Sequence, residues 1–241
     1  MTPERVFAAI DGTWPPARMI ETGPWMCREG RGGGQRVSAI SARAGVCDAD
    51  IPHAEAQAAA LGQAPLFLIR PGDDALDDML AARGYVIHDP VRALACAPAQ
   101  LTGQPVPPVM VFEVWKPLAI MCELWMEGGI GPGRIAVMER ASGPKTALLG
   151  RMSDKPAAVA YIAIHDRVAM LHALEVRSAF RRQGLAQWMM RAAAIWAQAH
   201  GADTLVVLCT RVNEAANRLY ATLSMTEVTA YHYRRSSRED L

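Results

Sequence analysis

The hexapeptide Arg181-Arg182-Gln183-Gly184-Leu185-Ala186 has residue types and a spacing suited to binding an anion. An apolar run over 168–176, typical of a strand, precedes it, and an amphipathic run over 185–199, typical of a helix, follows it. The sequence therefore predicts a strand-to-helix loop that offers free backbone N–H groups and a helix dipole to a phosphate. Glycine allows close approach of the backbone. A short glycine motif alone is weak support, because such motifs occur by chance.

The segment after this loop contains a second pattern. Gly201 ends the predicted helix, whose apolar face is assigned to Leu185, Trp188, Met189, Ala192, Ile195, Trp196 and Ala199. Thr204–Cys209 is typical of a buried parallel strand. Asn213 caps a helix over 214–223 that reads Asn213-x-x-Ala216-x-x-Leu219-Tyr220. The loop has no Gly-Lys-Ser/Thr and no third glycine, so neither a Walker loop nor a dinucleotide fingerprint fits.

Together the two patterns resemble those of the GNAT (Gcn5-related N-acetyltransferase) superfamily. The family motif Arg/Gln-x-x-Gly-x-Gly/Ala follows the fourth strand, and the asparagine and tyrosine border the thiol end of coenzyme A. The resemblance covers 109–235 and departs from the family at Ser224-Met225, where Gly-Phe is usual. It implies an α/β (α+β) GNAT fold: a central mixed, mostly antiparallel sheet with splayed parallel strands and flanking helices.

The predicted elements of the C-terminal half follow the GNAT order. Strands are expected at 109–115, 146–152, 157–165, 168–176, 204–209 and 227–233, and helices at 118–127, 134–141, 185–199 and 214–223. The proline-rich segment 97–108 is typical of a linker. We therefore expect a catalytic GNAT domain over 105–241.

The N-terminal half, 1–104, is interpreted as a smaller, degenerate GNAT-like α/β domain. Strands are expected within 13–43, at 66–69 and from 84, and helices at 52–61 and 75–83. A shift of 140 residues aligns Asp73 with Asn213 and Gly84 with Ser224. The counterpart of the anion loop, 41–46, has no matching arginine pattern. The chain is expected to have one coenzyme A site, although any strand–helix–strand unit would align in this way.

The resemblance also implies the roles of the site residues, with acetyl-CoA as co-substrate. Main-chain groups of Leu174 and Val176 would bind pantetheine, and the amides of Gln183, Gly184, Leu185 and Ala186 would bind the pyrophosphate. Arg181 and Arg182 either add charge there or are simply solvated. Asn213 borders the thiol end. Tyr220 is the candidate general acid that protonates the leaving thiolate, and a core role is its alternative.

Two side chains are candidates for the general base. An imidazole ordinarily titrates near neutral pH, which favours His172 as the base, and Glu175 could instead orient the amine. Their odd separation along one strand predicts that they point to opposite faces. A structural role for His172, and a water chain acting as the base, both remain open.

Composition narrows the class of protein. The 241 residues carry a formal net charge of +1, which gives no polybasic surface for nucleic acid or anionic membranes. The five cysteines lack CxxC spacing, so reduced thiols are expected, and no metal cluster is visible. No signal peptide or membrane span is evident, so a cytoplasmic location is expected. Trp14, Trp25, Trp115 and Trp125 either line an acceptor pocket between the halves or pack in the core.

We therefore expect an N-acetyltransferase that transfers acetyl from acetyl-CoA directly to a primary amine. The acceptor, a small molecule or a peptide, cannot be identified from the sequence, and a homodimer is left open. One alternative is a non-catalytic acyl-CoA-binding sensor or interaction module. Another is a transferase of aminoacyl or longer acyl groups.

Overall fold

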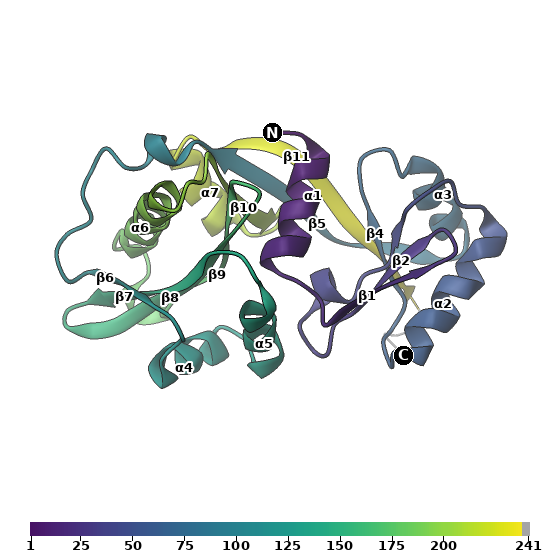
Figure 1. The fold of residues 1–241 in the computed structure, drawn as a ribbon, viewed down its shortest axis with the longest axis horizontal. Helices are drawn as coiled ribbons and strands as arrows, with labels where there is room; N and C mark the ends of the chain where they lie inside the picture. Colours follow the sequence, from purple (N-terminus) through teal and green to yellow (C-terminus); the bar gives the residue numbers. More distant parts are fainter. Residues whose placement is uncertain (238–241) are drawn as a thin grey trace.

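The computed structural model describes residues 1–237, which form two lobes joined by two long strands (Figure 1). The C-terminal lobe contains most of an eight-stranded mixed sheet with the order β4-β11-β5-β10-β9-β8-β7-β6. Its own strands are β6 (Val111–Val114), β7 (Lys145–Met152), β8 (Lys155–His165), β9 (Val168–Val176) and β10 (Thr204–Thr210). None of the helices within residues 1–237 has the length and apolar character required to cross a bilayer.

Helices cover both faces of this sheet. Helices α4 (Ala119–Glu127) and α5 (Pro132–Arg140) pack on one face around Trp125, Val159 and Tyr161. Helices α6 (Leu185–Ala199) and α7 (Glu214–Thr222) pack on the other face, around Met189 and Tyr220. Strand β9 and helix α6 begin and end at the predicted residues, because hydrophobic periodicity is strongest there.

The buried face of α6 differs from the prediction. Ile195 is exposed, whereas Met190 and the small residues Ala193, Ala194 and Ala197 are buried against the sheet. Alanine lets the helix approach the strands closely, so the helix is rotated relative to the face predicted from its larger apolar residues.

The N-terminal lobe begins with a helix that the sequence analysis did not predict. Helix α1 (Pro3–Thr13) starts at Thr2, whose hydroxyl accepts a hydrogen bond from the Arg5 N–H, and Pro3 and Glu4 occupy its first turn. These are ordinary N-terminal signals that could have revealed it. Helix α1 packs on β8 and β9, and so it contributes to the face that also carries α4 and α5.

The rest of this lobe is a small sheet with two helices. Strands β1 (Arg18–Thr22), β2 (Trp25–Glu29) and β3 (Ser41–Ala42) form an antiparallel sheet, followed by α2 (Ile51–Ala60), β4 (Leu66–Ile69) and α3 (Asp74–Ala82). A single parallel bridge, Ile40 to Phe67, connects β3 with β4. The expected strands within 13–43 are therefore short, and the 3₁₀ helix η1 (Gln35–Val37) interrupts them. Further 3₁₀ helices occur at Asp48–Asp50, Pro98–Gln100 and Ser178–Phe180.

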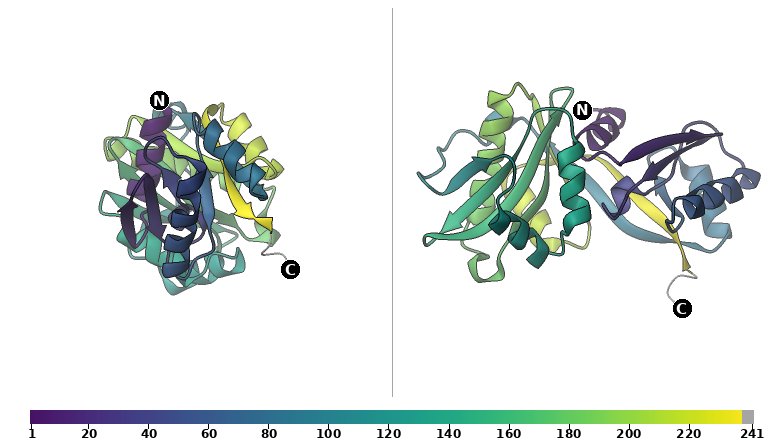
Figure 2. Two further views of the ribbon diagram at one scale, coloured as in Figure 1. Left: turned by 90° about the vertical axis from the view of Figure 1, so that its right-hand side faces the viewer. Right: turned by 60° about the horizontal axis from the view of Figure 1, so that its bottom comes forward.

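Two strands run through both lobes and exchange partners (Figure 2). Strand β5 (Tyr85–Cys96) pairs with β10 of the C-terminal lobe, and β11 (Thr226–Ser236) pairs with β4 of the N-terminal lobe. The two long strands also pair with each other along their length. Each lobe therefore contains the last strand of the other.

Outward from the β5–β11 pair, the order β4, β3, β2, β1 on one side corresponds to β10, β9, β8, β7 on the other, with β4 and β3 joined only by the isolated Ile40–Phe67 bridge. Helices α3 and α7 each span nine residues, and their first residues, Asp74 and Glu214, are 140 positions apart. Gly84 and Ser224, which follow these helices, both have positive φ, +85° and +54°. The parallel bridge between Ile40 and Phe67 corresponds to the parallel pair Leu171 and Val207. Phe67 and Val207 are again 140 positions apart. These correspondences support the tandem interpretation. The domain boundary between residues 104 and 105 stays a prediction.

Candidate active site

Strands β9 and β10 diverge near the middle of the large sheet. They pair in parallel only from Val168–Leu171 against Thr204–Val207, beyond which β10 continues to pair with β5 alone. A cavity of about 950 Å³ lies beside the divergence, and residues of β9, the loop before α6, the start of α6, and α7 line it. This cavity is called the cleft below.

A β-bulge in β9 reverses one prediction. Tyr161 of β8 pairs with His172, and Val159 pairs with Glu175, so two residues of β9 lie opposite Ala160. Ala173 in the bulge has φ +53°, an uncommon value for a residue other than glycine. The extra residue cancels the alternation of side chains. His172 and Glu175 therefore lie on the same face of the sheet, and the expectation of opposite faces was wrong.

The loop Arg181–Ala186 lines the cleft with unpaired backbone donors. Gly184 adopts the left-handed conformation (φ +84°) immediately before α6. Within the part of the chain that the structure describes, the four successive N–H groups of 183–186 have no hydrogen-bond acceptor. Four successive unpaired donors at a helix N-terminus can bind a phosphate-type anion.

The side chains of this loop are largely exposed. The Arg181 Nε donates to the Val176 carbonyl oxygen over 2.9 Å, and the Gln183 amide donates to the Ala179 carbonyl oxygen over 3.1 Å. Arg182 has φ +61° and makes no ion pair among residues 1–237. Its guanidinium is therefore available to an anion, whereas Arg181 is held against the end of β9.

Leu174 and Val176 line the cleft from β9. The Arg177 N–H donates to the Ala157 carbonyl oxygen on β8. Since main-chain groups alternate along a strand, those of Val176 and Leu174 point to the other edge, which β10 leaves open. That edge can accept an extended polyamide as an added strand.

Tyr220 and Asn213 line the opposite wall of the cleft. The Asn213 side chain caps α7 by accepting from the Ala216 N–H. Tyr220 is almost fully buried, and its hydroxyl makes no hydrogen bond within residues 1–237. Burial raises the pKa of Tyr220, and Cys209 and Glu175 raise it further. The hydroxyl is therefore protonated at neutral pH and free to donate.

Glu175 lines the cleft from β9, beside Gly128 at the end of α4. A Cβ atom on Gly128 would lie 2.7 Å from the Glu175 carboxyl carbon, so glycine leaves room for the carboxylate. Burial raises the pKa of Glu175, although Arg181 and Arg134 oppose the shift. A carboxylate in this environment is a stronger base than an exposed one.

His172 does not line the cleft and has partners at both ring nitrogens. The Arg36 guanidinium lies 3.0 Å from Nδ1, and the Thr13 hydroxyl lies 2.9 Å from Nε2. A guanidinium can only donate, so Nδ1 accepts, and Nε2–H donates to Thr13, which in turn donates to the Ala9 carbonyl oxygen. Burial, followed by Arg36, lowers the pKa of His172 well below its usual value. This arrangement is that of a neutral structural histidine.

A second cavity, of about 320 Å³, lies on the other side of the β9 bulge. Ala173 lines it, whereas the next residue, Leu174, lines the cleft. Both lobes contribute to its walls, including Trp14 after α1. Of the other candidate tryptophans, Trp25 and Trp125 are fully buried in the cores and Trp115 is partly exposed.

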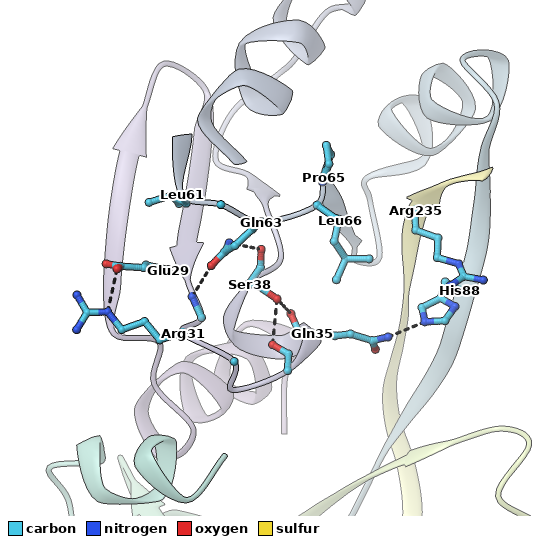
Figure 3. Close-up of a pocket in the computed structure, with 15 residues that line it drawn as sticks. Glu29, Arg31, Gln35, Ser38, Leu61, Gln63, Pro65, Leu66, His88 and Arg235 are labelled. Atoms are coloured by element: carbon cyan, nitrogen blue, oxygen red, sulfur yellow. Dashed lines mark hydrogen bonds and ion pairs between the residues drawn. The ribbon is translucent and has the colours of Figure 1, made fainter. Parts of the chain in front are cut away.

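A third cavity, of about 510 Å³, lies within the N-terminal lobe (Figure 3). The Gln35 amide and His88 Nε2, 2.6 Å apart, lie on one side, and Gln63 accepts a hydrogen bond from the Gly30 N–H on another. It contains none of the predicted site residues.

Comparisons with known proteins find similarity in both sequence and fold. Residues 121–225 match the family model described as the acetyltransferase (GNAT) family. A GCN5-related N-acetyltransferase from Kribbella flavida is similar in structure, with a TM-score of 0.70 and 22% identity, over 98% of this chain and 95% of that one. A functionally unknown conserved protein from Staphylococcus epidermidis has a TM-score of 0.71 and 11% identity, over 98% of each chain. No curated protein sequence matches the chain.

A third similar structure is a tandem GNAT protein from the clavulanic acid biosynthesis pathway, with a TM-score of 0.58 and 14% identity. The match covers 77% of this chain and 68% of that one. The protein described here therefore has the GNAT fold, and its residues 121–225 match the GNAT acetyltransferase family. Gly128, Arg36 and Arg134 could not be identified as site residues from the sequence, because their neighbours at the site are distant in sequence.

Proposed function

We propose that the protein is an acyl-CoA-dependent N-acyltransferase that transfers acetyl from acetyl-CoA to a primary amine. The observation that carries the proposal is the row of four free amides, 183–186, at the mouth of a cleft that also contains Glu175 and Tyr220. The amides would bind the pyrophosphate, assisted by Arg182, and the open edge at Leu174 and Val176 would bind the pantetheine arm.

The chemistry would need no covalent enzyme intermediate. The amine nitrogen attacks the thioester carbonyl carbon, the new C–N bond forms, and the C–S bond breaks. Glu175 accepts the proton that the amine loses, directly or through one water, and Tyr220 donates its hydroxyl proton to the leaving sulfur. We prefer Glu175 to His172 as the base, because both ring nitrogens of His172 are already hydrogen-bonded outside the cleft.

We further propose that the N-terminal lobe is a degenerate GNAT-like domain that shapes the acceptor side. The equivalent divergence in that lobe, between β3 and β4, is bridged by Arg70, which donates to the Ala42 carbonyl oxygen. A tandem GNAT protein among the similar structures gives this arrangement a precedent in fold.

The test is release of free thiol from acetyl-CoA in the presence of a panel of amines. Amine-dependent release that is lost in the Gly184→Asp variant would support the proposal. Acetyl-CoA binding without turnover of any amine would favour the alternative, a non-catalytic acyl-CoA sensor. The remaining alternative is a transferase of aminoacyl or longer acyl groups, and competition between acetyl-CoA and such donors tests it. Preference for one of these donors would show that the transferred group is not acetyl.

A further inference from the structure

The second cavity and the cleft meet at one point of the sheet. Ala173 and Leu174 are successive residues of the bulge, and they line the second cavity and the cleft respectively. On β10, Leu208 and Thr210 line the second cavity where this strand has already left β9. The second cavity and the cleft therefore both border the point where β9 and β10 diverge. A molecule in the second cavity could approach a thioester in the cleft at that point.

The walls of the second cavity carry two guanidinium groups without carboxylate partners. Arg36 of η1 lies over the Trp14 ring and donates to His172, and it makes no ion pair within residues 1–237. Arg134 of α5 has neither an ion pair nor a side-chain hydrogen bond in the same part of the chain. Asp89 is the one carboxylate in this lining, and it already lies 3.5 Å from His88.

The backbone of the N-terminal lobe makes room for one of these groups. Gly34 has φ +91°, and a Cβ atom there would lie 3.2 Å from the Arg134 Nε. The charge of Arg134 also lowers the pKa of the Glu175 carboxyl group, against the larger effect of burial, which raises it. The wall of the second cavity also lies near the proposed base in the chain, because Ile130 lines this cavity and Gly128, two residues earlier, lies against the Glu175 carboxyl group.

We propose that the acceptor amine carries a carboxylate, which Arg134 and Arg36 bind in the second cavity while the amine reaches Glu175 at the bulge. Guanidinium groups bind carboxylates through paired, charge-assisted hydrogen bonds, which give both affinity and orientation. The excess of positive charge in the lining favours an amino acid, or a peptide whose carboxylate is close to its amine, over a simple alkylamine. This inference rests on the proposed acyl transfer and names its acceptor class.

The experiment compares amino acids with their carboxamides, which differ only in the charged group. Acetyl-CoA turnover is measured with each pair for the wild type, for Arg134→Gln, and for Arg167→Gln as a control. Arg167 is an exposed arginine in the turn between β8 and β9, paired with Asp203 and outside both cavities. We expect kcat/KM to favour the acids by about 10- to 100-fold in the wild type and the control.

In Arg134→Gln that preference should disappear, mainly through KM for the acids, while kcat/KM for the carboxamides should fall far less than kcat/KM for the acids. Asp89→Asn should retain or increase the preference, because it removes negative charge from the same cavity. Equal use of acids and carboxamides by the wild type would overturn the inference and leave the proposed acyl transfer intact.

A binding measurement separates the two proposals. Calorimetric titration of N-acetyl amino acids, and of their carboxamides, into the protein with coenzyme A requires no turnover. Binding of the acids that is lost in Arg134→Gln would support the carboxylate site even if no amine is acetylated, in which case the acyl transfer fails. If carboxylate compounds neither bind nor turn over, the inference is wrong.

Discussion

Glu175 and Tyr220 line the same cleft from opposite walls, one on β9 and the other on α7. The charge of Glu175 contributes to the raised pKa of Tyr220, after burial and Cys209. Burial also raises the pKa of Glu175. The pair therefore combines a carboxylate of increased basicity with a hydroxyl that keeps its proton, as proton removal from an amine and proton donation to a thiolate require.

Replacement of Tyr220 by phenylalanine should lower kcat by about 10²- to 10⁴-fold, because the thiolate then leaves without a proton donor. Affinity for acetyl-CoA should be nearly unchanged, since the ring remains. Tyr161→Phe is a matched control: it removes a buried hydroxyl that donates to the Met138 carbonyl oxygen outside the cleft. Steady-state kinetics and calorimetry measure the two effects, and unchanged turnover in Tyr220→Phe would remove this residue as the acid.

Replacement of Glu175 by glutamine should lower kcat/KM by about 100-fold or more and remove an acid limb from its pH profile. The base works only when deprotonated, so wild-type activity falls as pH drops through the pKa of Glu175. Since burial raises that pKa, the limb should lie above 4.5, the usual value for a glutamate. An acid limb that persists in Glu175→Gln would assign the base to another group.

The sequence predicts the C-terminal lobe well because its signals are local. The loop at Gly184 and the cap at Asn213 each combine hydrophobic periodicity with one residue that suits the turn. The exchange of β5 and β11 between the lobes was not predictable in the same way. Both strands mix apolar with charged residues, and their partners are set by packing between segments far apart in the chain.

The relation of His172 to Glu175 could not be predicted from spacing, because one bulged residue changes the face of every residue beyond it. Nothing at Ala173 signals a bulge, since alanine has no preference for positive φ. The arginines of the second cavity could not be predicted as neighbours from the sequence for a related reason. Arg36 and Arg134 come from different lobes and meet only in the folded chain.

His172 should make the stability of the fold depend on pH in the acidic range, because it is buried without charge. Burial lowers its pKa in the folded state, whereas the unfolded chain binds a proton near pH 6.5. The unfolded state therefore binds more protons as pH falls, and the free energy of unfolding should decrease by up to about 2 kcal/mol between pH 7 and pH 5.

Urea unfolding at both pH values tests this in the wild type and in His172→Gln. The variant should be less stable at pH 7 by about 1–3 kcal/mol, because Thr13 and Arg36 lose their shared partner. It should also lose the part of the pH dependence that comes from the imidazole. An equal decrease in both proteins would contradict a buried neutral histidine.

Replacement of Gly184 by aspartate should abolish acetyl-CoA binding, because a carboxylate would lie beside the amides that bind the pyrophosphate. Asparagine is the matched control: it has nearly the same shape, tolerates positive φ, and carries no charge. We expect Gly184→Asn to retain measurable affinity and Gly184→Asp to retain none. Equal affinities of the two variants, measured by calorimetry, would show that charge at this loop does not matter.

The protein should bind one acetyl-CoA per chain, although both lobes contain a pair of diverging parallel strands. In the N-terminal lobe Arg70 bridges that divergence by donating to the Ala42 carbonyl oxygen. Asp48 and Asp50 precede α2, and hydrogen bonds from the Cys47 backbone and side chain lower the pKa of Asp50. Negative charge at that helix N-terminus opposes a pyrophosphate.

Calorimetric titration should therefore give a stoichiometry of one for the wild type and no binding for Gly184→Asp. A stoichiometry of two, or one site that survives in Gly184→Asp, would place acetyl-CoA in the N-terminal lobe as well. Arg70→Ala, which opens the bridge between β3 and β4, should not create a second site, because the acidic residues before α2 remain.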